Sequence, residues 1–162
     1  MPSIRKNMVE IDKTDRKILH ELQQDGGLSN QELAERVGLS PSPCSRRVKS
    51  LVDAGVILGR STQLDRRALG LNLSVILHIS MDKHTPERFE NFEAHVKRYP
   101  EVQQCLLVTG QEADYVLQVS VPDIDYYQHF LLDRVTRIDG VTGVHSSFVM
   151  RRIVDTTALP LL

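Results

Sequence analysis

The chain of 162 residues is poor in cysteine and has no long hydrophobic run. Its two cysteines, Cys44 and Cys105, are far apart in the sequence, which forms neither a CxxC motif nor the disulfide framework of a small secreted domain. No apolar run approaches the roughly 18 residues of a membrane helix, and the first ten residues lack the apolar core of a signal peptide. We therefore expect reduced thiols in a soluble, cytoplasmic protein.

The signatures of enzymes and metal sites are also missing. The six histidines show no HxxxH or HxxEH spacing, and no P-loop, GxSxG or GxGxxG motif occurs. Cys44 is expected on the packing face of a helix, where it acts as a small core residue and not as a nucleophile. We expect no catalytic residues, no metal and no cofactor. Glycine and proline are not in excess, which argues against collagen-like or long disordered segments.

The net charge of −1 conceals a basic segment. Residues 36–67 contain seven basic residues against two acidic ones, a local charge of +5. The basic residues are Arg36, Arg46, Arg47, Lys49, Arg60, Arg66 and Arg67. A basic segment in an otherwise acidic protein indicates a surface for a polyanion such as DNA. The alternative is a solvated surface that carries its positive charge without a partner.

The first third of the chain predicts three short helices, over residues 12–24, 29–37 and 41–53. Ser29 and Glu32 have the spacing of a capping box, and Gly38 permits a tight turn between the second and third helices. Ser40 is expected to cap the third helix and Pro41 to occupy its first position. A short strand or wing is expected over residues 56–60, followed by a capped turn over 65–70 that acts as a hinge.

The third helix has two different faces. One is expected to pack inward, with Cys44, Val48, Leu51 and Val52, whereas the other presents Ser42, Ser45, Arg46, Lys49 and Asp53. A helix that packs by one face and is basic on the other can enter the major groove, which is roughly 12 Å wide. Two helices joined by a glycine turn, the second basic on its outside, predict a helix-turn-helix.

From Leu71 onward the pattern predicts strand, helix, strand, strand, helix, strand. The segments are residues 71–81, 85–99, 102–108, 115–121, a helix that begins at Asp123 with Val135 and Ile138 inward, and 144–153. This order is the βαββαβ, ferredoxin-like arrangement, so the fold class is α+β. Two helices on one face leave the other face of the sheet open, with Ile76 and Val116 exposed, and we expect a partner chain to cover it.

Several segments together resemble the Lrp/AsnC, or feast/famine, family of leucine-responsive transcription regulators. They are DKTDRKIL, SNQELAERVGLSPSPCSRRVKSLVDAGVI, LDRRALGL, TGQEADYVL and SSFVMRRIVDTTALPL, and they extend from Asp12 almost to Leu162. The resemblance implies an N-terminal winged helix-turn-helix that binds DNA. It also implies a ferredoxin-like domain that dimerises through its sheet and often assembles into octamers, with an amino-acid effector bound between dimers.

The resemblance places DNA contacts on Ser42, Ser45, Arg46, Arg47 and Lys49. Arg46 and Lys49 are expected to reach guanine or phosphate, and Arg47 to contact the flanking backbone. It places the effector site on Thr109, Gly110, Gln111, Asp114, Ser146 and Ser147. Three residues separate Gly110 from Asp114, where many relatives have two, and among them Glu112 adds a charge that opposes a ligand carboxylate. The alternative interpretation is a plain hairpin turn.

These observations predict a winged helix-turn-helix over residues 1–60, a hinge over 61–70 and an effector-binding and oligomerisation domain over 71–162. The predicted function is a sequence-specific regulator that responds to leucine or another apolar amino acid. Its expected partners are double-stranded DNA with pseudo-palindromic operators, the amino acid, and further copies of itself in a homodimer or octamer. We expect no membrane partner. Two alternatives remain: a ligand-independent architectural DNA-binding protein, and a small-molecule-binding protein or enzyme built on the second domain.

Overall fold

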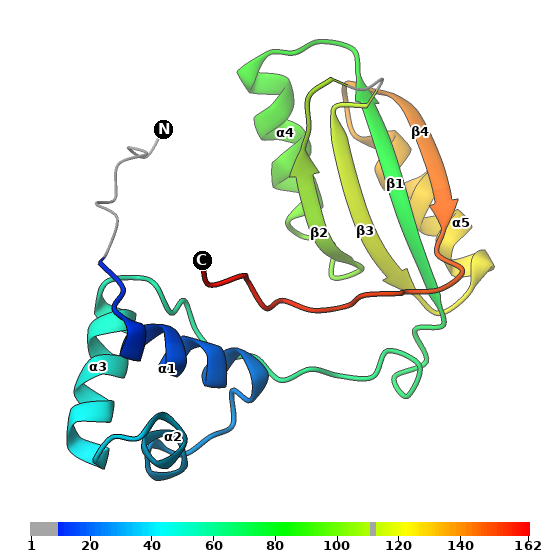
Figure 1. Cartoon of the computed structure of the whole chain (residues 1–162). Coiled ribbons are helices and arrows are strands. Elements are labelled where there is room, and N and C mark those ends of the chain that lie inside the picture. The colour runs from blue at the N-terminus through cyan, green and yellow to red at the C-terminus, as the bar shows by residue number, and fades with distance from the viewer. Residues whose placement is uncertain (1–9, 111–112) are drawn as a thin grey trace. The chain divides into compact units, whose positions relative to one another are not determined.

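The computed structural model describes residues 10–110 and 113–162, which divide into two compact units (Figure 1). The helical unit comprises residues 10–63 together with 154–162, and the sheet unit comprises residues 64–153. The sequence placed all residues from 71 to 162 in the second domain. The last nine residues depart from that prediction, because they belong to the helical unit, where Leu161 packs against the core.

The helical unit contains α1 (Lys13–Gln24), α2 (Asn30–Val37) and α3 (Pro41–Asp53). The capping box of Ser29 and Glu32 is present at the start of α2, and Gly38 ends that helix with a φ of 74°. Pro41 occupies the first turn of α3 as expected, but the Ser40 side chain makes no capping hydrogen bond. The three helices enclose a core whose most deeply buried side chains are Ile18, Leu33, Ala34 and Cys44.

The segment after α3 differs from the prediction. Residues 56–60 form no strand; Val56 and Ile57 donate backbone hydrogen bonds to the carbonyl of Leu51 and pack against the helical core. Val56 and Ile57 therefore extend the core, and within the described part of the chain this run pairs with no strand. The capped turn at residues 65–70 is confirmed, since the Asp65 carboxylate accepts from the backbone N–H groups of Arg67 and Ala68.

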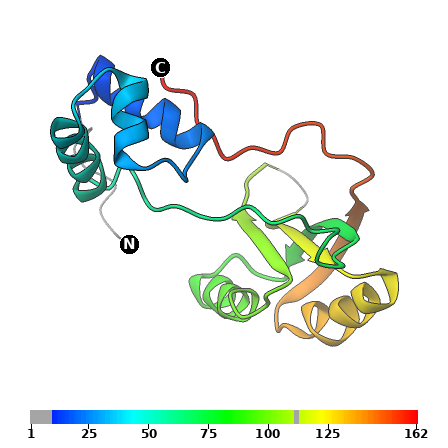
Figure 2. The same cartoon turned by 90° about the horizontal axis from the view of Figure 1, so that it is seen from below.

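In the described residues the sheet unit contains four strands, two helices and, between the second helix and the last strand, one turn of 3₁₀ helix. The elements are β1 (Leu73–Met81), α4 (Pro86–Val96), β2 (Val102–Leu107), β3 (Tyr115–Val121), α5 (Ile124–Asp133), η1 (Val135–Arg137) and β4 (Val141–Phe148). The strand order is β2-β3-β1-β4, with every neighbouring pair antiparallel. Figure 2 shows both helices on the same side of the sheet. The ferredoxin-like prediction is confirmed.

The last two elements are shorter than predicted. The helix that begins after Asp123 ends at Asp133, and η1 carries Val135 inward instead. The final strand was predicted over 144–153 but extends over Val141–Phe148. Its partner strand explains the difference: β4 pairs with β1 from Met81–Val141 to Val75–Phe148, so residues beyond Phe148 soon pass the end of β1.

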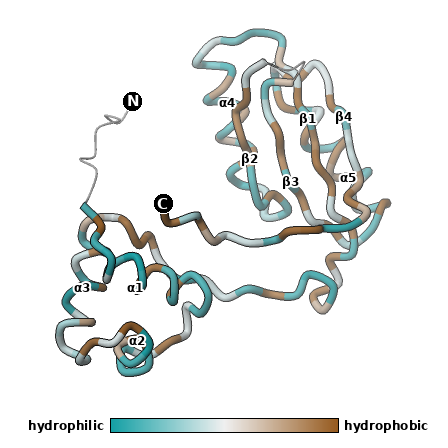
Figure 3. The backbone as a smooth tube through the Cα atoms, viewed as in Figure 1, coloured by the Kyte–Doolittle hydropathy of each residue, from teal (hydrophilic) through white to brown (hydrophobic). Residues whose placement is uncertain are grey.

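Alternation along β1 separates the two faces of the sheet. Val75, Leu77, Ile79 and Met81 are buried under the helices, and Figure 3 shows hydrophobic colour along β1 and β3. The opposite face, here called the outer sheet face, carries Ile76 and Val116, which are half-buried. No helix in the described part of the sheet unit covers this face (Figure 2). Among the described residues, no helix is long and apolar enough to cross a membrane.

Candidate functional site

The outward face of α3 collects polar and cationic side chains. Ser42, Ser45, Arg46 and Lys49 are spaced so that they share one side of the helix, and all four are exposed. Within the described ranges, none of these side chains has an ion-pair or hydrogen-bond partner. The opposite side is fixed by Cys44, which is completely buried and whose thiol pKa is raised by that burial. The burial of Cys44 therefore presents an unpaired basic face to solvent.

Arg47 has a different role from its neighbour Arg46. Its guanidinium pairs with Asp12 at 2.7 Å and with Asp15 at 2.8 Å, at the start of α1. The hydrogen bond to Asp15 and then that to Asp12 raise the pKa of Arg47. The pKa of Asp12 is lowered, first by the backbone N–H of Asp15 and then by Arg47. Arg47, expected on the DNA backbone, therefore joins α3 to α1 in this structure.

The turn between α2 and α3 sets the position of the basic face. Gly38 adopts a left-handed conformation, and the N–H of Leu39 donates to the carbonyl of Ala34 at 2.9 Å. The Asn30 side chain then donates to the carbonyl of Pro41 at 2.8 Å, which links the first residues of the two helices. These bonds make the turn a rigid support for α3.

The predicted effector residues lie mainly on the hairpin between β2 and β3. Thr109 and Gly110 are exposed, and Gly110 has a φ of 83°. Gln111 and Glu112 lie outside the described residues. Asp114 connects the hairpin to the end of β1: its N–H donates to the carbonyl of Ile79 at 2.8 Å, and its carboxylate accepts from the N–H of Met81 at 2.7 Å.

A histidine that the sequence did not single out completes this end of the sheet. His84 Nε2 lies 2.7 Å from the other carboxylate oxygen of Asp114, and the His84 side chain is 70% exposed. Nearby, Arg88 pairs with Asp82 at 3.1 Å and with Asp139. No sequence spacing signals the pairs His84–Asp114 and Arg88–Asp139, because their members lie far apart in the chain.

The two predicted serines lie on a different strand. Ser146 shares a hydrogen bond with the Tyr127 hydroxyl beneath the sheet, and Ser147, opposite Ile76, is on the outer sheet face. β1 separates β4 from β3, so two strand spacings of about 4.8 Å each lie between the serines and the strand that carries the hairpin. One chain therefore does not bring Asp114 and the serines together.

Comparison with known proteins also separates an N-terminal helical part from a C-terminal part built on the sheet. A family model described as the Lrp/AsnC ligand binding domain matches residues 74–159, and one described as winged helix-turn-helix DNA-binding matches residues 11–57. The leucine-responsive regulatory proteins of Salmonella typhimurium and Escherichia coli K12 are each 39% identical over 150 residues, covering 93% of this chain and 91% of theirs.

Solved structures of transcriptional regulators are also similar to this chain. A transcriptional regulator from Neisseria meningitidis in complex with L-methionine is 43% identical, with a TM-score of 0.89, over 93% of this chain and 97% of that one. A feast or famine regulatory protein from M. tuberculosis complexed with L-methionine is 30% identical, with a TM-score of 0.81, over 93% of this chain and 99% of that one.

Proposed function

The chain belongs to the Lrp/AsnC family of transcriptional regulators, and we propose that it binds operator DNA through α3 and changes that binding when it takes up an apolar amino acid. The exposed, unpaired cations on the outer face of α3 carry this proposal. The protein acts by binding alone, without a catalytic step, and works in the cytoplasm on chromosomal DNA.

In the proposed DNA complex, α3 lies in the major groove with Arg46 and Lys49 toward the base edges or phosphates. Ser42 and Ser45, nearer the helix start, contribute hydroxyl groups to the same face. Arg47 supports this arrangement indirectly, because its pairs with Asp12 and Asp15 fix α3 against α1. The free cations of α3 are therefore the residues we expect to determine affinity.

The proposed effector site uses the hairpin of the sheet unit. A free amino acid needs donors for its carboxylate, acceptors for its ammonium group and an apolar pocket. We assign the donors to the backbone around Thr109 and Gly110 and to Gln111, which follows them in the sequence. We assign the acceptors to Asp114, whose oxygens retain lone pairs beyond their bonds to Met81 and His84. Methionine in two related structures and leucine in the names of curated relatives favour an apolar effector.

A second copy of the chain completes the proposed effector site. We propose that the outer sheet face, with Ile76 and Val116, packs against a second copy, and that dimers join into an octamer with the effector between them. Only another copy can then place Ser147 beside a hairpin, whereas Ser146 keeps its bond to Tyr127. A two-fold dimer reads pseudo-palindromic half-sites about one helical turn apart, or a multiple of it. The effector changes the affinity for the operator to the extent that it binds one assembly more tightly than the other.

A direct test combines two measurements on the full chain. Thermal unfolding with each of the twenty amino acids at millimolar concentration should show stabilisation by methionine, leucine or a similar apolar amino acid. Operator binding followed by fluorescence anisotropy should then change with the same amino acid and with no other class. An absence of stabilisation by every amino acid, together with unchanged DNA binding, would favour the ligand-independent architectural function.

A further inference from the structure

The C-terminal segment, residues 154–162, belongs to the helical unit, and its end lies beside α1 (Figures 1 and 2). The side-chain amide of Gln23 donates from Nε2 to the carbonyl of Leu159 at 3.1 Å, and the N–H of Leu159 donates to Gln23 Oε1 at 2.6 Å. Two opposed hydrogen bonds between one side chain and one backbone residue fix both the position and the direction of the segment. Gln23 is thus a specific attachment point on α1.

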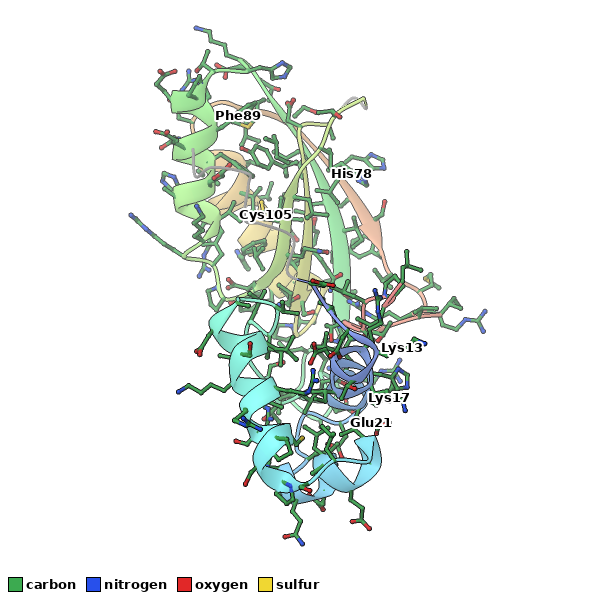
Figure 4. All side chains as sticks on the ribbon, turned by 60° about the vertical axis from the view of Figure 1, so that its left-hand side comes forward. Lys13, Lys17, Glu21, His78, Phe89 and Cys105 are labelled. Atoms are coloured by element: carbon green, nitrogen blue, oxygen red, sulfur yellow. The ribbon has the colours of Figure 1, made fainter. Side chains whose placement is uncertain are left out.

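Leu161 adds an apolar contact two residues farther on. It is half-buried and packs against the core of the helical unit, whereas Leu162 is 98% exposed. Leu161 also lines a hollow of about 400 Å³ whose other walls are Arg16, Lys17, His20, Glu21 and Arg36. Figure 4 labels Lys17 and Glu21, one helical turn apart along α1. The segment therefore docks by an apolar side chain within a polar surround.

The residues just before this segment are attached to the sheet unit. The Arg152 guanidinium donates to the Ser74 hydroxyl at 2.8 Å, and the N–H of Val149 donates to the carbonyl of Ser74 at 2.9 Å. With the Gln118 amide turned so that its oxygen faces Arg152, that oxygen also accepts at 2.8 Å. The backbone from Arg152 to Leu159 can span at most about 25 Å when fully extended. Both ends of a short segment are thus held, one on each unit.

We propose that residues 154–162 act as a strap, docked on α1 through Gln23 and Leu161, that couples effector binding in the sheet unit to DNA binding by the helical unit. The proposal rests on the proposed function, because it assigns a route to that regulation. The docked strap gives the chain a second connection between its units, in addition to the first linker, where the chain passes from Gln63 to Leu64. A change at Ser74 or Gln118, which Arg152 contacts just before the strap, can then reach α1 without passing through the first linker.

The docking is tested by hydrogen exchange on the full chain. In the wild type we expect the Leu159 amide to be protected, because it donates to Gln23. Gln23→Ala should raise its exchange rate about fivefold or more, the effect of losing one net hydrogen bond. Gln24→Ala is the matched control, since Gln24 is the exposed neighbour on α1. An unprotected Leu159 amide in the wild type would overturn the docking.

The coupling is tested by operator affinity with and without the stabilising amino acid. Typical coupling between two sites changes affinity by about 5–150-fold. We expect Gln23→Ala and Leu161→Asp to abolish most of this change while amino-acid stabilisation and effector-free DNA binding persist. Leu162→Asp, which adds the same charge at an exposed position, should respond as the wild type does.

The outcomes separate this proposal from the proposed function. If the variants release the strap but keep the full amino-acid response, the strap does not transmit the signal and the inference is wrong. If the wild type binds no amino acid or does not respond to it, the proposed function fails with the coupling, while hydrogen exchange still decides whether the strap docks.

Discussion

Two adjacent arginines of α3 should respond to the same substitution in opposite ways. Arg46 is exposed and has no ion-pair partner in the described part of the chain, whereas Arg47 pairs with Asp12 and Asp15. Replacing each by alanine removes the same charge and the same number of atoms from one helix. Any difference between the variants therefore comes from where the structure places the two side chains.

For Arg46→Ala we expect a loss of DNA affinity with little change in melting temperature. A lost bidentate base contact costs about 1–3 kcal/mol, which is about 5- to 150-fold in affinity. A lost phosphate contact instead lowers the slope of log K against log salt by about 0.9 and weakens binding to all sequences alike. For Arg47→Ala we expect a lower melting temperature, because Asp12 and Asp15 lose their shared cation and α3 loses its attachment to α1.

Fluorescence anisotropy with a labelled operator and with unrelated duplex DNA, at several salt concentrations, distinguishes the two kinds of contact. Thermal unfolding of the same samples reports the effect on the fold. Arg98→Ala is a suitable control, because it removes an exposed positive charge from the sheet unit. The lysine of the same face, Lys49, should behave as Arg46 does.

The reasoning is refuted if Arg46→Ala binds operator as the wild type does while Arg47→Ala loses DNA affinity without any loss of thermal stability. That result would mean that Arg47 leaves its carboxylate partners in the complex and that the exposed face of α3 is not the DNA-binding face.

Four further predictions follow from individual contacts. Gly38→Ala should destabilise the helical unit by about 1 kcal/mol, seen in thermal unfolding, because a β-carbon is unfavourable at a φ of 74°. Ile76→Asp should shift sedimentation from dimer to monomer by placing a charge on the outer sheet face, whereas Leu58→Asp, at a residue that is 94% exposed in the helical unit, should not. Burial raises the pKa of Cys105 to about 11, so its reaction with a thiol reagent should be slow at pH 7 and accelerate up to about pH 11. The pKa of Asp12 lies below its ordinary 3.8, so the stability it contributes is complete above about pH 4 and lost as the pH falls through the lowered pKa; Asp12→Asn should flatten acid unfolding in that range.

Local sequence patterns determined most of the secondary structure. The start of α2 follows from Ser29 and Glu32, three residues apart, and its end from a glycine that alone tolerates the required backbone conformation. The faces of β1 follow from strict alternation, since successive side chains point to opposite sides of a strand. The outward placement of Arg46 and Lys49 likewise follows from helical spacing and the burial of Cys44. Each of these features depends on residues only a few positions apart.

Contacts between distant residues decided the rest. The apolar run at residues 56–60 begins beside the end of α3, so Val56 and Ile57 pack against the helical core, whereas Leu58 is exposed. The end of β4 was predicted wrongly because it depends on where β1 ends. The place of the last nine residues was predicted wrongly because Gln23, which holds Leu159, is on the first helix.

In the candidate site, too, some features follow from local sequence and others from contacts between distant residues. The sequence by itself determined that α3 has a basic face and that a glycine hairpin precedes Asp114, because both features depend on the spacing of residues that are close together in the chain. Only the tertiary structure assigned Arg47 to Asp12 and Asp15, Asp114 to Met81 and His84, and the C-terminal segment to α1. Hydrogen bonds and ion pairs form between groups about 3 Å apart in space, whatever their separation along the chain. Which cation remains free for DNA is therefore a property of the fold.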